Sequence, residues 1–236
     1  MKIPQPKLLY IFYTINQTVA LYIKNQLLKK KTFLLLLIAV VVAYGYNSIN
    51  HKYKSEHKPK VDVSKTNEKA KEALTFCRKN NFNQDFCILI DMSIHSGLNR
   101  FFVYDFKQNK ITRQMLVGHG CCNYPWSQTW SKDDPTFSNK DGSHCSSLGK
   151  YKIGQRAWSD WGINVKYVLH GLEETNSNAQ SRYIVFHSWE KVSDKEVYPN
   201  GTPEGWGCPT ISNANMKIID PILKGSAQPV LMWIYQ

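Results

Sequence analysis

The stretch Phe86-Cys-Ile-Leu-Ile-Asp-Met92, followed by Arg100-Phe-Phe-Val-Tyr-Asp-Phe106, decides the fold of this chain. Both runs are rich in β-branched and aromatic residues, and the turn-like pair Ser96-Gly97 lies between them. Short apolar runs bounded by turn residues are typical of buried strands. A polar turn at residues 107–110 leads to a third such run, ending at Val117. The segment therefore predicts a meander of short antiparallel strands.

The rest of the chain extends this pattern on both sides. Strand-like runs recur at residues 149–155, 165–169, 183–187 and 229–235, and helical spacing is found at residues 64–80 and 212–224. Residues 118–147 form a long stretch rich in Gly, Ser, Asp, Cys and Trp, and irregular stretches of this length usually carry function. The sequence predicts a mainly β domain, a sandwich or an open barrel, with a few peripheral helices.

The positive charge of the chain is concentrated in its N-terminal part. The net charge is +12, and residues 1–60 hold ten Lys and Arg against one acid, Glu56. Residues 61–236 hold 20 Lys and Arg against 17 Asp and Glu, so the folded part is nearly balanced. A basic surface for nucleic acid is therefore not expected.

The N-terminal part has the pattern of an export or membrane segment. Lys29-Lys-Lys31 precedes the apolar run Phe33–Ala43, an order that directs the rest of the chain outward. The run, about 14 residues to Tyr46, is shorter than the roughly 20 that span a bilayer comfortably, and Ala43-x-Gly45 resembles a cleavage site. Cleavage and anchoring both stay open. We expect a leader at 1–46, a polar tether at 47–63 and one domain at 64–236.

Six cysteines in an exported chain predict disulfides. The candidate pairs are Cys77 with Cys87, and Cys145 with either Cys121 or Cys122. A zinc site is the alternative for the group His119, Cys121, Cys122, His144 and Cys145. Adjacent cysteines do not form the usual Cys-x-x-Cys chelate, and an oxidising compartment favours disulfides over thiolates. We therefore predict no metal.

A cysteine and a histidine supply the chemistry that the sequence offers. His187 ends the strand-like run 183–187, and Cys208 lies downstream between Gly207 and Pro209. An imidazole can take the proton of a thiol and so create a nucleophile, while the backbone amides of Gly207 and Cys208 can form an oxyanion hole. Spacing alone does not distinguish such a nucleophile from an inert cysteine.

Several runs in order along residues 82–235 carry a family resemblance. They are Phe137-Ser-Asn139, Gly142-Ser143, Ser146-Ser-Leu-Gly149, Thr175-Asn-Ser-Asn-Ala179, Ile184-Val-Phe-His-Ser-Trp189 and Gly205-Trp-Gly-Cys-Pro209. Together they resemble the murein L,D-transpeptidase catalytic domain family, a divergent relative of the YkuD-type L,D-transpeptidases. YkuD-type enzymes typically place the Cys in Ser-His-Gly-Cys. In this chain Trp206 stands where the wider superfamily has a second His.

The resemblance implies an L,D-transpeptidase-like domain in the cell envelope, with peptidoglycan stem peptides as its partners. His187 would activate Cys208, a thioester would form on tetrapeptide stems, and no cofactor would be needed. Trp206, Ser188, Ser146 and Ser147 would be substrate contacts. The alternatives are an L,D-carboxypeptidase or peptidoglycan amidase with the same dyad, a non-catalytic peptidoglycan-binding protein, and a thiol protease. The oligomeric state is unknown, and a monomer is the default expectation.

Overall fold

The chain forms two compact units, Met1–Glu56 and His57–Gln236, in a computed structural model that describes residues 5–236. The N-terminal unit is the helix α1 (Gln5–Glu56). Within it, Lys24–Tyr53 is long enough to cross a membrane and contains an 18-residue stretch with a mean hydropathy of 2.0, although a signal sequence has the same properties. The helix includes the first part of the segment 47–63 and ends shortly before Pro59, which disfavours helical backbone at the residue before it.

The second unit contains one mixed sheet of eight strands. The strands are β1 (Phe86–Asp91), β2 (Phe101–Asp105), β3 (Lys110–Met115), β4 (Gly149–Trp158), β5 (Val165–Gly171), β6 (Val185–Ser188), β7 (Thr210–Ile211) and β8 (Val230–Tyr235). Their order is β3-β2-β1-β8-β4-β5-β6-β7. The pairs β1–β8 and β6–β7 are parallel, and the other pairs are antiparallel. The predicted β1-β2-β3 meander is therefore confirmed.

The two edges of the sheet approach each other and nearly close it into a barrel. Beyond β3 the chain continues to Gly118, whose N–H donates to the carbonyl of Thr210 in β7 at 2.7 Å. Gly118 is needed there, since an added Cβ would lie 2.4 Å from the Thr210 hydroxyl oxygen. The expectation of a mainly β, open-barrel domain with a few helices is confirmed.

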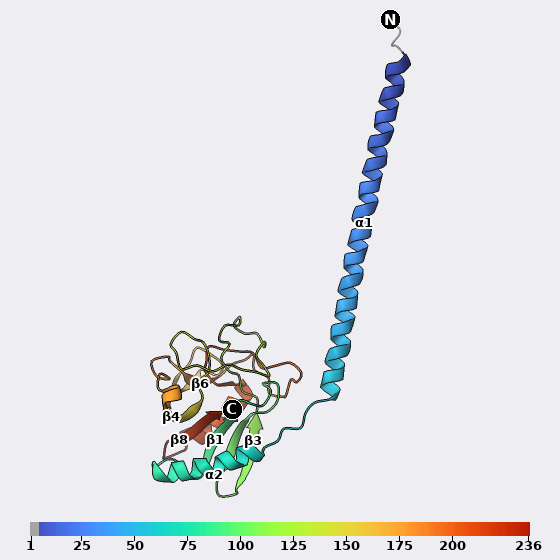
Figure 1. Cartoon of the computed structure of the whole chain (residues 1–236). Helices are drawn as coiled ribbons and strands as arrows, with labels where there is room; N and C mark the ends of the chain where they lie inside the picture. The colour runs from blue at the N-terminus through green and yellow to red at the C-terminus, as the bar shows by residue number, and fades with distance from the viewer. Residues whose placement is uncertain (1–4) are drawn as a thin grey trace. The chain divides into compact units, whose positions relative to one another are not determined.

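Both faces of the central strands are buried, and this explains their continuous apolar character. One face, with Ile88 and Ile90, joins the core inside the barrel, which α3 (Asn213–Lys224) also enters through Met216 and Ile219. The opposite face packs against α2 (Ser64–Lys79) (Figure 1), in a cluster that comprises Ala70, Ala73, Cys77, Cys87, Leu89, Phe102, Leu231 and Trp233. The alternation follows the two-residue period of a strand.

The cysteines of the long irregular segment include a disulfide, whereas those between α2 and β1 are free thiols. Cys122 and Cys145 form a disulfide across the long irregular segment between β3 and β4, and Cys121 remains a thiol. The predicted bond between Cys77 and Cys87 is not formed, which corrects the sequence-based expectation. Both side chains are fully buried between α2 and β1, where a thiol serves as a small apolar group.

Candidate active site

Strand register brings His187 and Cys208 to one place. In β6, His187 pairs with Lys166 of β5 on one side and with Thr210 of β7 on the other. Phe186 points into the core and stacks on Phe101 at 5.6 Å between ring centroids, which fixes the face to which His187 is turned. Cys208 lies two residues before Thr210. The backbone pairing of β6 with β7 therefore places both residues on the wall of one cavity.

The imidazole of His187 has its tautomer set by the backbone. Its Nδ1 lies 3.0 Å from the carbonyl oxygen of Ser188, which can only accept, so Nδ1 carries the hydrogen. Nε2 of the neutral ring is then the free acceptor. Burial lowers the pKa of His187 below its ordinary value of 6.5, and the Lys166 ammonium acts in the same direction. The ring is thus held neutral, in the form that accepts a proton.

The Cys208 thiol is partly exposed and is held by the backbone of β6. The N–H of Val185 donates to Sγ at 3.4 Å, and within the described residues Sγ makes no hydrogen bond to His187. Burial raises the pKa of the thiol, while the Val185 N–H and the charges of Arg182 and Lys166 act against that rise. The pair therefore rests as a neutral thiol and a neutral imidazole. Such contacts often tighten only in the substrate complex.

The peptide unit before Cys208 has a fixed orientation. Buried Ser146 donates its hydroxyl hydrogen to the carbonyl of Gly207 at 3.0 Å and accepts the N–H of Gly120 at 3.0 Å. A trans peptide directs its N–H opposite its carbonyl, so the Cys208 N–H points away from Ser146. In the part of the chain that the structure describes, the N–H groups of Gly207 and Cys208 have no partner. They are available to an oxyanion.

Gly207 is required at its position for two reasons. Its φ of +101° lies in a region that L side chains rarely adopt, and an added Cβ would lie 2.5 Å from the carbonyl oxygen of Cys145. Cys145 is in turn fixed by its disulfide to Cys122, and its carbonyl accepts from Arg182 at 2.7 Å. The segment around Cys145 is therefore the support against which the Cys208 loop is packed.

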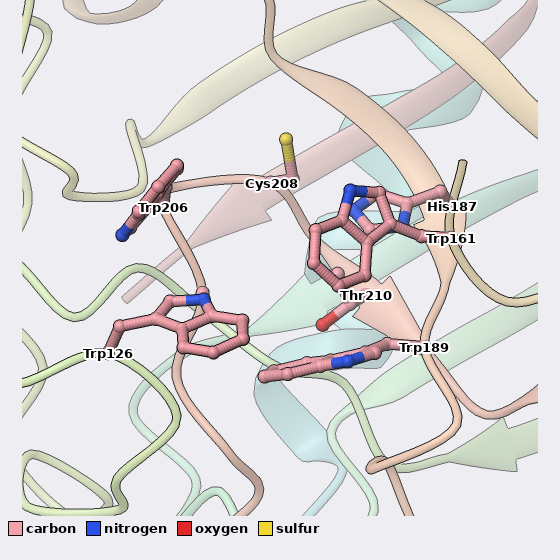
Figure 2. Close-up of a pocket in the computed structure, with 8 residues that line it drawn as sticks. Trp126, Trp161, His187, Trp189, Trp206, Cys208 and Thr210 are labelled. Atoms are coloured by element: carbon pink, nitrogen blue, oxygen red, sulfur yellow. The ribbon is translucent and has the colours of Figure 1, made fainter. Parts of the chain in front are cut away.

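Two cavities meet at His187 and Cys208. The smaller, about 110 Å³, is walled by the indoles of Trp126, Trp161, Trp189 and Trp206, with Thr210 (Figure 2). Two buried polar atoms there, Nε1 of Trp189 and Oγ1 of Thr210, lack hydrogen-bond partners among the described residues. The larger, about 430 Å³, is more polar and includes Asp160, Lys166 and Gln180. A group bound at Cys208 can therefore extend in two directions.

The side chains predicted to contact substrate fall into two classes. Trp206 is 62% exposed, lines the tryptophan-walled cavity and stacks on His144 at 5.2 Å between centroids. By contrast, Ser146, Ser147 and Ser188 are buried, and their hydroxyls bond within the protein. Ser147 donates to Ser138, and Ser188 accepts from Ile163. These three serines position the loops, which corrects their expected role.

The alternative zinc group does not assemble. His119 faces Arg100 and Ser131, at 2.7 and 2.9 Å, and Cys122 and Cys145 are joined in the disulfide. The described residues contain no cluster of three His, Cys, Asp or Glu suited to a metal.

Sequence reasoning missed Trp126, Thr210, Arg182 and Lys166. The first two line the tryptophan-walled cavity, and the charges of the last two act on Cys208. Their importance depends on register and loop packing, for which the sequence gives no local signal.

A family model described as an L,D-transpeptidase catalytic domain matches residues 57–235. No curated protein matches the chain.

Three solved structures are among those that resemble the chain. One is the helical cell shape determining protein Pgp2 from Campylobacter jejuni, with 12% identity and a TM-score of 0.38 over 64% of this chain and 47% of Pgp2. The Ldtfm–avibactam carbamoyl enzyme has 10% identity and a TM-score of 0.38 over 65% and 50%. An L,D-transpeptidase from Xylanimonas cellulosilytica has 11% identity and a TM-score of 0.35 over 68% of each chain. The chain thus spans about half the length of the first two.

The support of the Cys208 loop by Ser146 can be tested by Ser146→Ala. The change leaves the Gly120 N–H and the Gly207 carbonyl without their partner, and each buried unpaired group costs about 1–3 kcal/mol. We expect a clear loss in the free energy of unfolding, measured by urea denaturation followed by tryptophan fluorescence. Ser181→Ala is the matched control, since its hydroxyl is exposed and bonds only to Asn178. Equal stability of the two variants would contradict the assignment.

Proposed function

This chain belongs to the L,D-transpeptidase catalytic domain family, and from that premise we propose that it is a peptidoglycan L,D-transpeptidase with Cys208 as nucleophile and His187 as base. The observation that carries the proposal is the β6–β7 register, which brings a neutral imidazole and a thiol to the wall of one cavity. Two free backbone N–H groups, those of Gly207 and Cys208, belong to the same loop as the thiol. These are the parts that acyl transfer through a thioester requires.

The first half of the proposed reaction forms the acyl-enzyme. Nε2 of His187 takes the thiol proton as Sγ of Cys208 attacks the carbonyl that joins the L-centre of the third stem residue to D-Ala. The resulting oxyanion accepts hydrogen bonds from the N–H groups of Gly207 and Cys208. The tetrahedral intermediate then collapses, the C–N bond breaks, and the imidazolium gives its proton to the departing amine of D-Ala. A thioester on Cys208 remains.

The second half resolves the thioester. His187 takes a proton from the side-chain amine of another stem, which attacks the thioester carbonyl. The C–S bond breaks, and the thiolate recovers its proton from the imidazolium. The product is a 3→3 crosslink. If water attacks instead, the same residues give L,D-carboxypeptidase activity.

The proposal places the domain in the cell envelope. The apolar part of α1 suits either an anchor or a signal sequence, and the Lys cluster before it favours export of the domain that comes after it. We propose a leader at residues 1–46, a tether at 47–63 and the catalytic domain at 64–236, with peptidoglycan stem peptides as partners.

The role of Cys208 can be tested by covalent labelling with a carbapenem, whose strained acyl group reports a reactive thiol. We expect intact-mass spectrometry to find one adduct on the full chain and none on Cys208→Ala. Cys121→Ala is the control, because Cys121 is also a free thiol but is buried outside both cavities. An adduct on Cys208→Ala, or none on the folded wild type, would refute the assignment.

The role of His187 can be tested through the pH dependence of kcat/KM. Because burial lowers the pKa of His187, its neutral form persists below pH 6.5, and we expect activity to fall only at pH values under that number. We expect His187→Gln to lower kcat by roughly 10²- to 10⁴-fold and to abolish this acid limb. An acid limb retained by the variant would assign the base to another group.

The products distinguish transpeptidation from hydrolysis. Incubation of the full chain with tetrapeptide muropeptides should yield free D-Ala and crosslinked dimers, detected by liquid chromatography and mass spectrometry. Tripeptides without dimers would leave the carboxypeptidase as the function. Release of neither product would favour the non-catalytic peptidoglycan-binding alternative.

A further inference from the structure

Lys166 is a cation at the reacting centre that has no partner among the described residues. It is directly opposite His187 in the antiparallel pair β5–β6, so the two side chains share one face of the sheet. Both line the larger cavity together with Cys208. Lys166 is partly buried, and within the described part of the chain its ammonium makes no hydrogen bond or ion pair. A partly desolvated ammonium without a partner favours an anionic ligand.

The other cations near Cys208 are already engaged. The guanidinium of Arg182 donates to the carbonyls of Ser138 and Cys145 and to the hydroxyls of Ser143 and Ser147, at 2.7–3.2 Å. Lys191 bonds to Ser127 and lies over the rings of Trp126 and Trp189. No Lys or Arg of the described residues lines the tryptophan-walled cavity. Lys166 is therefore the cation that remains available to a bound anion.

The proposed donor carries an anion at a fixed distance from the bond that is broken. In a stem that ends one residue after the scissile carbonyl, the C-terminal carboxylate lies within the length of one residue, roughly 3.5 Å per residue in an extended chain. A cation that binds this carboxylate must therefore lie beside the nucleophile and its base. Lys166 lies in this position because it is paired with His187 across β5 and β6.

We propose that Lys166 binds the C-terminal carboxylate of the donor stem, so that the larger cavity holds the leaving residue and selects stems ending one residue after the scissile bond. The inference rests on the proposed function and assigns a specificity-determining residue to it. A stem with an uncharged or longer C-terminus would leave the ammonium unpaired in a partly desolvated cavity. Sites of this kind reject analogues that lack the matching group.

One acidic side chain faces the same cavity. Asp160 is exposed and makes no ion pair with Lys166. A solvated carboxylate is screened more strongly than a partly buried ammonium, so Lys166 acts on a bound carboxylate more strongly than Asp160 does. Asp160 also provides a matched control, because Asp160→Asn changes the charge of this cavity by one unit without removing the cation.

The test compares two donors, a tetrapeptide stem with a free C-terminal D-Ala and the same stem ending in D-alaninamide. The full chain is incubated with each donor in mild detergent, and the consumption of the donor is followed by mass spectrometry to obtain kcat/KM. For the wild type we expect the acid to be preferred by roughly 10- to 150-fold, the range of a hydrogen bond to a charged group. In Lys166→Met we expect the preference to disappear, because kcat/KM for the acid donor falls. This fall should come from KM more than from kcat. Lys166→Arg should restore the preference, and Asp160→Asn should keep it.

The outcomes separate the inference from the function on which it rests. Carbapenem labelling of Cys208 in each variant shows that the fold and the nucleophile are intact, and Lys166→Gln replaces Lys166→Met if the latter does not label. If the wild type consumes acid and amide equally, or if Lys166→Met keeps the preference, the carboxylate assignment is wrong while the transpeptidase proposal stands. If the wild type consumes neither donor, the proposed function itself fails.

Discussion

The backbone of Thr210 is the constraint on which the rest of the site depends. It pairs with His187 across the parallel β6–β7 ladder, and its carbonyl accepts the N–H of Gly118, which brings the two edges of the sheet together. The same residue therefore takes part in closing the barrel and in placing Cys208 near His187. A sheet that failed to close would also leave Cys208, two residues before Thr210, without a defined position relative to His187.

The loop that carries Cys208 is held by a layer of supporting contacts from the segment between β3 and β4. Gly205 pairs with Gly120, Ser146 bridges Gly120 and Gly207, and the disulfide Cys122–Cys145 closes the same segment. Glycines allow the backbones to approach this closely: an added Cβ on Gly120 would lie 2.2 Å from the carbonyl oxygen of His144. The irregular segment between β3 and β4 is thereby ordered by individual hydrogen bonds and a disulfide, where a strand would be ordered by the regular hydrogen bonds of a sheet.

The sequence allowed the elements and the antiparallel β1-β2-β3 meander to be predicted, but not the order of the other strands. Strand periodicity identified β1, β2 and β8, because both faces of these strands are buried and their apolar runs are continuous. Nothing in those runs specifies that β1 pairs with β8 in parallel. The same limit applies to the site: local chemistry and family motifs singled out His187 and Cys208, whereas Lys166 and Thr210 matter only through register. Ser146, Ser147 and Ser188 were misassigned because burial depends on packing that a motif does not encode.

Electrostatics explains why the resting pair can be neutral and still be suited to the proposed reaction. Burial raises the pKa of Cys208 and lowers that of His187, so both favour their uncharged forms. Lys166 opposes an imidazolium but favours a thiolate, and its effects on the two members of an ion pair therefore partly cancel. Arg182 differs from Lys166, because its charge favours a thiolate at Cys208 without acting on His187. In the proposed reaction the Arg182 charge favours the thiolate as the proton leaves it, while Lys166 binds the donor carboxylate and acts on KM.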